Sequence, residues 1–286
     1  MSKSMYYPQP ELTLEEKKMP LAKFFEKYPL LKVPPLQKRL LDLGPMDPAD
    51  AVPVENWLDF LQVEGYSNVD FGYCMMPDGS GYYEEYYVTQ PGEITTEMSR
   101  WYTNWINYKS KSMVEGQGNL RYKLWCHLDH WDHAYVNGKD GTDGVWSLGT
   151  LDLGQTGLEN SFEEIAYTIN LREFGLTEEW EKELKDAGCT FRAAYEAVPG
   201  SDGLLSGGHL LLGFQRPCAY GGREHFRREW IGYTVRNGQI VRAEGTPCSE
   251  EYLKNVLTHN IVEHMHTQRF LPELYAEYHD KPIDED

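Results

Sequence analysis

Basic residues are scarce in this sequence. It has 27 Lys and Arg against 45 Asp and Glu, a formal net charge of −18. A surface this acidic repels phosphate backbones and anionic lipid headgroups, so binding to nucleic acid or to membranes is disfavoured. Long apolar runs are missing too, since the longest, at residues 73–76, falls far short of the ~20 residues that a membrane helix needs. The polar N-terminal segment has no signal-peptide core, and we expect a cytoplasmic protein.

Cysteine is also sparse, and several chemical motifs are absent. The five cysteines are scattered and never form Cys-x-x-Cys, which disfavours a disulfide framework or a thiolate zinc site. The sequence contains no His-Glu-x-x-His, no Gly-x-Ser-x-Gly and no glycine-rich phosphate or dinucleotide loop. Standard zinc peptidases, α/β-type serine hydrolases and nucleotide-binding enzymes are therefore unsupported.

Aromatic residues, in contrast, are abundant. Phe, Trp and Tyr make up 13% of the 286 residues, with 20 Tyr and 8 Trp. This composition suits a large pocket in which rings pack and phenolic hydroxyls form hydrogen bonds. The length allows one large domain, or one domain plus a smaller one, and a chain of this size can fold without disulfides or metals.

The hydrophobic pattern changes near residue 65. Residues 1–65 carry short helical patterns, the first capped by Thr13 and the others at residues 35–43 and from residue 53 onward, and we interpret them as a small helical region. In residues 66–286, the main domain, β-branched and aromatic runs predict strands. The predicted strands are residues 68–75, 81–89, 121–127, 163–170, 191–198, 207–214, 229–236 and 239–244. The predicted helices of this part are residues 95–108 and 177–187.

A long helix follows the last predicted strand. Ser249 is a suitable N-cap, two glutamates follow it, and residues 252–269 have a helical pattern that should end before Pro272. Many antiparallel strands followed by a long C-terminal helix predict an α+β fold, in which a curved sheet grips that helix.

Six of the nine histidines lie in two clusters, at residues 126–133 and 259–266. On the C-terminal helix, His259 and Glu263 are four residues apart, so both project from one face and can chelate a single ion. The apolar residues sharing this face indicate that it points into the protein. An isolated His-x-x-x-Glu is, however, commonly a solvated pair on a helix surface, and that interpretation stays open here.

The first cluster can complete a metal site. His130 offers a third ligand, and Glu163 or Glu164 offers a fourth. Two imidazoles and two carboxylates, with a position left for water, suit a catalytic zinc ion. The same mixed nitrogen and oxygen set also suits iron or manganese.

Two stretches resemble the 2,4-diacetylphloroglucinol hydrolase and phloretin hydrolase family. One is the predicted Tyr-Lys-Leu-Trp strand at residues 122–125, which follows a Trp-rich helix and precedes His130; the other is the helix with His259 and Glu263. The resemblance covers roughly residues 70–280. It implies a Bet v1-like helix-grip domain after a small N-terminal region, a homodimer, and one zinc ion per chain held by His, Glu, His and Glu.

Carried over residue by residue, the resemblance implies a specific ligand set. The implied metal ligands are His130, Glu164, His259 and Glu263. Glu164 is the first choice for the second ligand, Glu163 the second choice and Glu159 the third. The alternatives arise because the stretch before these residues is longer than in the relatives, which shifts the alignment by a residue or two.

The family cleaves the carbon–carbon bond between an acyl group and an electron-rich phenolic ring, and a carboxylic acid is released in this retro-Claisen reaction. The ring carbon takes a proton, water activated by the metal attacks the acyl carbonyl, and the ring leaves as a stabilised phenolate. The resemblance implies catalytic roles for Tyr122, His209 and Tyr220, and substrate binding by Tyr122, His133 and Tyr220. His133 replaces an Asn of some relatives, a departure that bears on the proton relay and on the substrate.

Two other hypotheses fit the same residues. A helix-grip domain that binds aromatic ligands without converting them needs no metal, so tight binding of phenolic ketones without stoichiometric metal would distinguish it. A mononuclear iron oxygenase uses two His and one carboxylate. It consumes dioxygen, whereas a hydrolase needs only water.

Overall fold

The computed structural model describes residues 4–9, 11–66, 69–110, 113, 115–158, 161–198, 208–243 and 245–285. Four residues named above as strand ends or as a candidate ligand lie outside the described residues: Asn68, Glu159, Gly207 and Glu244. The chain divides into two compact units, each assembled from separate segments. The first comprises residues 1–35, 92–164 and 258–286, and the second comprises residues 36–91 and 165–257.

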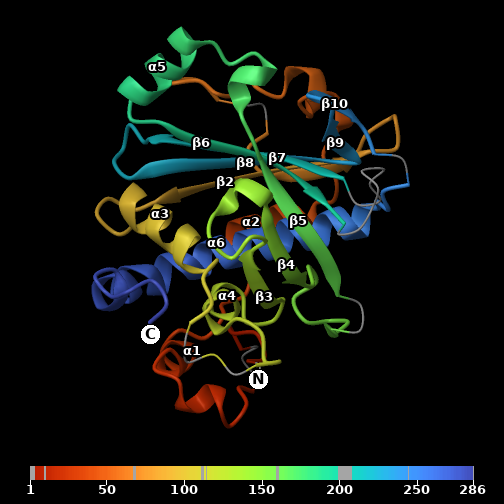
Figure 1. Ribbon diagram of the computed structural model, residues 1–286. Helices are drawn as coiled ribbons and strands as arrows, with labels where there is room; N and C mark the ends of the chain where they lie inside the picture. The colour runs from red at the N-terminus through yellow and green to blue at the C-terminus, as the bar shows by residue number, and fades with distance from the viewer. Residues whose placement is uncertain are drawn as a thin grey trace. The chain divides into compact units, whose positions relative to one another are not determined.

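The first unit combines short helices with one strand pair. Its elements are η1 (Glu16–Lys18), α1 (Ala22–Lys27), α3 (Thr96–Trp105), α4 (Leu120–Trp125), β3 (His130–Tyr135), η4 (Gly141–Asp143), β4 (Val145–Gly149) and the start of β5 (Phe162–Ile169). Strands β3 and β4 pair antiparallel, with an irregularity between His130 and Asp132. Most of α6 (Glu250–Tyr278), the long helix in Figure 1, also belongs to this unit.

An aromatic core fixes α6 within the first unit. Trp105 and Tyr102 of α3 pack with Phe270 of α6 in one buried cluster. Beside it lies a fully buried guanidinium, since Arg121 donates hydrogen bonds to the carbonyls of Trp105 at 3.2 Å and Ile283 at 2.6 Å. This side chain therefore ties α4 to the residues that follow α6.

The second unit is built on a large antiparallel sheet. Its elements are α2 (Pro35–Asp42), η2 (Pro48–Asp50), η3 (Val54–Asn56), β1 (Gly72–Met75), β2 (Gly81–Thr89), η6 (Leu171–Phe174), α5 (Glu178–Asp186), β6 (Thr190–Ala197), β7 (His209–Pro217), β8 (Arg223–Ile231), β9 (Tyr233–Arg236) and β10 (Gln239–Arg242). Hydrogen-bonded neighbours follow the order β1-β2-β8-β7-β6-β5, and β9 pairs with β10. The long neighbours β7 and β8 run side by side in Figure 1.

The two faces of this sheet differ in chemistry. One face carries Tyr82, Leu210 and Trp230, which belong to the apolar core of the unit. The alternation of side chains along a strand places Tyr83 and Glu229 on the opposite face. That second face is polar although it is buried, and the first turns of α6 approach it.

Several predicted elements are confirmed, and others are corrected. The strand at 81–89 and the helices near 95–108 and 177–187 are present. Residues 121–127 are not a strand, because the side chain of Asn119 accepts a hydrogen bond from the Arg121 amide and begins α4 there. The predicted strand 229–236 is interrupted between β8 and β9, and β3 and β4 were not predicted.

The C-terminal helix is also longer than predicted. It continues through Pro272 to Tyr278. Pro272 has no amide to donate to the Gln268 carbonyl, but burial of Phe270 and Leu274 on either side compensates for the missing bond. Within the described ranges, no helix has both the length and the apolar composition needed to cross a bilayer.

Candidate metal centre

The imidazoles of His130 and His259 converge on one oxygen of Glu263. His130 Nε2 lies 3.2 Å, and His259 Nε2 3.3 Å, from Glu263 Oε2. Each of the three side chains is only 3% exposed. One ligand atom from each residue lies within 4.8 Å of those of the other two. All three residues belong to the first unit, and together they can hold a metal ion.

Local structure explains how these side chains meet. His259 and Glu263 are one turn apart on α6, as the helical spacing predicted. His130 is the first residue of β3 and follows α4 after a tight turn, in which its amide donates to the Cys126 carbonyl at 3.0 Å. The cap that makes residues 120–125 helical therefore also determines where His130 lies.

His130 is oriented by Tyr122. Its Nδ1 lies 3.2 Å from the Tyr122 carbonyl oxygen, so this nitrogen carries the proton and donates it. The two rings stack with centroids 3.9 Å apart and planes inclined by 2°. The unprotonated Nε2 is consequently left facing Glu263, which is the form that binds a metal.

His259 is oriented by a buried carboxylate. Its Nδ1 lies 2.6 Å from Asp129 Oδ2, and Asp129 is 2% exposed. Asp129 also accepts hydrogen bonds from the Thr150 hydroxyl at 2.6 Å and from the amides of Leu153 and Gly154 at 2.9 and 3.0 Å. Leu153 and Gly154 have φ angles of 56° and 76°, and this left-handed backbone directs both amides to the carboxylate. A carboxylate held in this way fixes the ring of a metal-binding histidine.

The charges of the site favour a cation. Burial lowers the pKa of His130, although Glu263 opposes the shift, so this imidazole is neutral near pH 7. Burial opposes a charge on His259, but Glu263 and Asp129 hold its pKa well above the ordinary value. Burial would raise the pKa of Glu263, but His259 and His130 hold it well below the ordinary value. The two ionised carboxylates, Glu263 and Asp129, outweigh the one positive charge on His259 while His130 is neutral, which leaves net negative charge that a divalent cation would neutralise.

A second group of donors surrounds the other nitrogen of His259. It consists of Cys126, Asp129 and His259, all buried. Burial raises the pKa of the Cys126 thiol, so the sulfur stays protonated and is a poor ligand. Burial alone would raise the pKa of Asp129. The nearby His259 and the hydrogen bonds that Asp129 accepts outweigh this effect and lower its pKa to about 2. The group formed by His130, His259 and Glu263 is therefore the better metal site, and its two nitrogens and one oxygen fit zinc.

The fourth predicted ligand lies on a neighbouring strand. Glu164 is half-buried on β5, and its Oε1 accepts a hydrogen bond from the Ser147 hydroxyl at 3.3 Å. Glu163 is exposed and accepts a hydrogen bond from the Trp146 indole at 2.6 Å. Within the described part of the chain, neither glutamate joins the groups of donors close enough to share an ion.

Two predicted pocket residues adjoin the metal centre. The Tyr122 ring lies between the imidazoles of His130 and His133, with centroids 3.9 and 4.3 Å away. Both Tyr122 and His133 are buried. They therefore lie directly beside His130.

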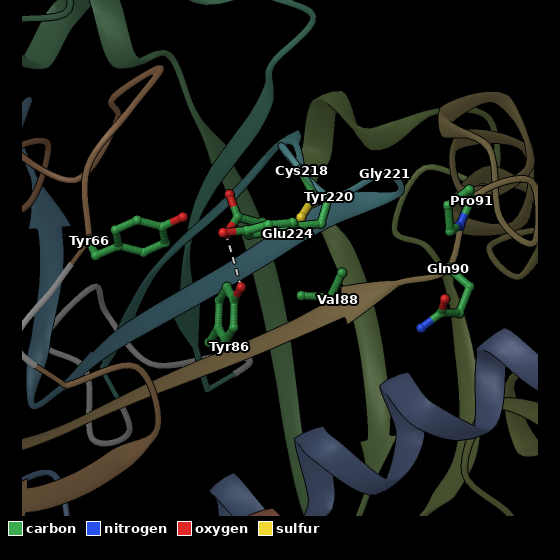
Figure 2. A pocket seen from close by; sticks show the side chains of 9 residues that line it. All are labelled: Tyr66, Tyr86, Val88, Gln90, Pro91, Cys218, Tyr220, Gly221 and Glu224. Carbon is green, nitrogen blue, oxygen red and sulfur yellow. Dashed lines mark hydrogen bonds between the residues drawn. The ribbon is translucent and has the colours of Figure 1, made fainter.

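The other two predicted residues belong to the second unit. His209 is buried at the start of β7. Tyr220 is 93% exposed and lies beside a cavity of about 440 Å³. Figure 2 shows this cavity, in which the Tyr86 hydroxyl donates to Glu224 at 2.9 Å.

Sequence reasoning missed the role of Asp129. This residue precedes His130 directly and lies 130 positions before His259, whose ring it holds. An acidic residue inside a histidine cluster was the available signal, because metal-binding imidazoles commonly donate to a carboxylate.

The fold and the site place this chain among mixed α/β proteins with a buried histidine–carboxylate group that can hold a metal ion. The family described as DAPG hydrolase PhiG domain matches residues 53–276. The chain is also 27% identical to phloretin hydrolase from Eubacterium ramulus over 287 aligned positions, which cover 93% of each protein. The chain belongs to the DAPG hydrolase family, and the resemblance read from its sequence is confirmed. The protein is accordingly a hydrolase of carbon–carbon bonds.

Proposed function

We propose that this protein is a zinc-dependent hydrolase that cleaves the bond between an acyl group and a phloroglucinol-type ring and releases a carboxylic acid. Family membership and the similarity to a phloretin hydrolase support the substrate class. The observation that carries the zinc dependence is the convergence of His130 Nε2 and His259 Nε2 on Glu263 Oε2. Their Nδ1 atoms are tied to a carbonyl and a carboxylate, as expected of metal-binding imidazoles.

In this proposal His130, His259 and Glu263 hold the zinc ion, and Glu164 is the fourth ligand. Bound there, zinc would supply Lewis-acid chemistry, since it lowers the pKa of water toward neutrality and polarises a carbonyl. Asp129 keeps the His259 ring in its binding orientation. The Glu164 assignment predicts that Glu164→Gln lowers zinc affinity, whereas Glu163→Gln, which removes an exposed carboxylate, leaves it unchanged.

The remaining steps fall to pocket residues. Tyr122 and His133, whose rings stack, are proposed to bind the hydroxyl groups of the phenolic substrate. Tyr122, His209 and Tyr220 are proposed to move protons, because the ring carbon must be protonated before it can leave as a stabilised phenolate. The reaction then consumes one water and needs no oxidant.

Hydrolysis of diacetylphloroglucinol and of phloretin tests the proposal, with release of the carboxylic acid as the readout. Glu263→Gln should lower the rate more than about 100-fold, because it weakens the metal site directly. Glu273→Gln is the matched control, since Glu273 lies on the same helix in a surface ion pair with Lys27. Equal activity of the Glu263→Gln variant and the wild type would contradict the proposed site.

We also propose that the sheet and α6 form a Bet v1-like helix grip and that the protein is a cytoplasmic homodimer. The large antiparallel sheet and the long C-terminal helix are compatible with that fold. Sedimentation equilibrium of the purified protein tests the dimer, and a mass equal to that of a single chain would contradict it.

A further inference from the structure

A second group of buried ionisable side chains lies on the polar face of the sheet in the second unit. His209 of β7 stands directly opposite Glu196 of β6, and their Nδ1 and Oε2 atoms are 3.2 Å apart. Glu229 of β8 brings its Oε2 to within 3.8 Å of the same nitrogen. His209 and Glu229 are buried. Buried charges are costly unless they are paired, and they concentrate at functional sites.

The charges of this group balance. Arg227 donates from Nε to Glu229 Oε1 at 2.7 Å. Burial would raise the pKa of Glu196, but His209 and Arg227 hold it below its ordinary value. Two carboxylates and one guanidinium therefore favour the imidazolium form of His209, in which both ring nitrogens carry a proton.

The other nitrogen of His209 faces a phenol. Its Nε2 lies 3.1 Å from the Tyr252 hydroxyl. Tyr252 is half-buried in the first turn of α6, where its amide donates to Ser249 Oγ at 3.1 Å. Close packing fixes this turn, because a Cβ on Gly81 would lie 2.7 Å from Leu253 Cδ2.

We propose that Tyr252 and His209 form a proton relay in which the Tyr252 hydroxyl protonates the aromatic carbon that carries the acyl group. The proposal rests on the proposed function, which requires this proton transfer. Tyr252 and His209 both belong to one unit, and Glu196 and Glu229 are positioning residues that act through the imidazole.

The transfer balances in atoms and electrons. The Tyr252 O–H bond breaks, and an electron pair of the ring forms the new C–H bond. The proton on His209 Nε2 moves to the Tyr252 oxygen, and His209 is reprotonated from water. The hydroxide left when water reprotonates His209 takes the proton of a ring hydroxyl, which becomes a carbonyl, so the ring reaches the ketone tautomer from which the acyl bond can be cleaved.

Exchange of the ring hydrogens of phloroglucinol in D2O, followed by proton NMR, tests the relay without cleavage of any acyl bond. The wild type should accelerate exchange above the rate in buffer. Tyr252→Phe and His209→Gln should each lower that acceleration roughly 100-fold, as expected on removing a general acid. Tyr195→Phe is the control, because Tyr195 lies on the same strand as Glu196 but on its other face and stacks on Tyr167.

The outcomes separate the relay from the proposed function. Absence of wild-type acceleration, or unchanged exchange in Tyr252→Phe, overturns the relay. Exchange by a wild type that releases no carboxylic acid supports the relay and contradicts the proposed hydrolysis. Glu196→Gln should shift the alkaline limb of the exchange-rate profile to lower pH, because the imidazolium loses a stabilising charge; an unshifted profile contradicts the positioning role.

Discussion

Acidification should destabilise the protein through His127, which is buried in the first unit. Its ring stacks on Phe25 with centroids 4.6 Å apart, and its Nδ1 lies 3.1 Å from Gln9 Oε1. Its Nε2 lies 3.2 Å from Nε2 of a second buried imidazole, His266. Only one proton can occupy the space between these nitrogens, and burial lowers the pKa of His127 from 6.5 to about 3.

The direction and size of the effect follow from proton linkage. Above pH 6.5 neither the folded nor the unfolded chain protonates this residue, so its contribution to stability is fully present. Below that pH the unfolded chain binds a proton at this residue, whereas the folded chain does not bind it until about pH 3. The free energy of unfolding therefore falls between pH 6.5 and about pH 3. At about pH 5 the loss amounts to roughly 2 kcal/mol for His127 alone.

Urea unfolding followed by tryptophan fluorescence at about pH 7.5 and about pH 5 measures this loss. Other groups titrate in the same range, so the informative quantity is the difference between the wild type and His127→Gln. The variant should lose about 2 kcal/mol less on acidification than the wild type. His279→Gln, near the C-terminal end of α6, serves as the control. Equal losses in the wild type and His127→Gln would refute the reasoning.

Three further predictions concern the metal centre. Asp129→Asn should weaken zinc binding 10- to 100-fold by chelator competition, whereas Asp132→Asn, which removes the half-buried partner of Lys109, should not. Gly149→Ala should lower the free energy of unfolding by about 1–3 kcal/mol and weaken zinc binding, because its Cβ would lie 2.5 Å from the Asp129 carbonyl oxygen. Gly213→Ala is the matched control, with its nearest atom at 3.8 Å, and equal unfolding energies for the two variants would contradict the packing argument. Cys126→Ser should leave zinc affinity unchanged. Loss of the metal in this variant would indicate that zinc binds instead to the group formed by Cys126, Asp129 and His259.

Features set by local spacing were predictable from the sequence. The pairing of His259 with Glu263 depends only on helical periodicity, and it is present as expected. The cap at Thr13 is likewise local, and the Thr13 hydroxyl accepts a hydrogen bond from the Glu16 amide at 3.2 Å. The strand at residues 81–89 has a strong aromatic pattern bounded by glycine, and it is found with those bounds.

Features set by tertiary contacts were not predictable. Residues 121–127 have the aromatic and apolar composition of a strand, but Asn119 and burial make α4 helical. The link between Asp129 and His259 joins residues 130 positions apart, so no sequence spacing reveals it. The same holds for the contact of Tyr252 with His209, which requires the register of the sheet and the position of α6.

Metal analysis of the purified protein tests the central claim most directly. Elemental analysis of the wild type should find about one zinc per chain. The His259→Ala variant should lose the zinc, because only His130 and Glu263 then remain of the three converging ligands. His279→Ala, on the residue that follows α6, should keep the metal. Zinc retained in His259→Ala, or no metal in the active wild type, would contradict the account.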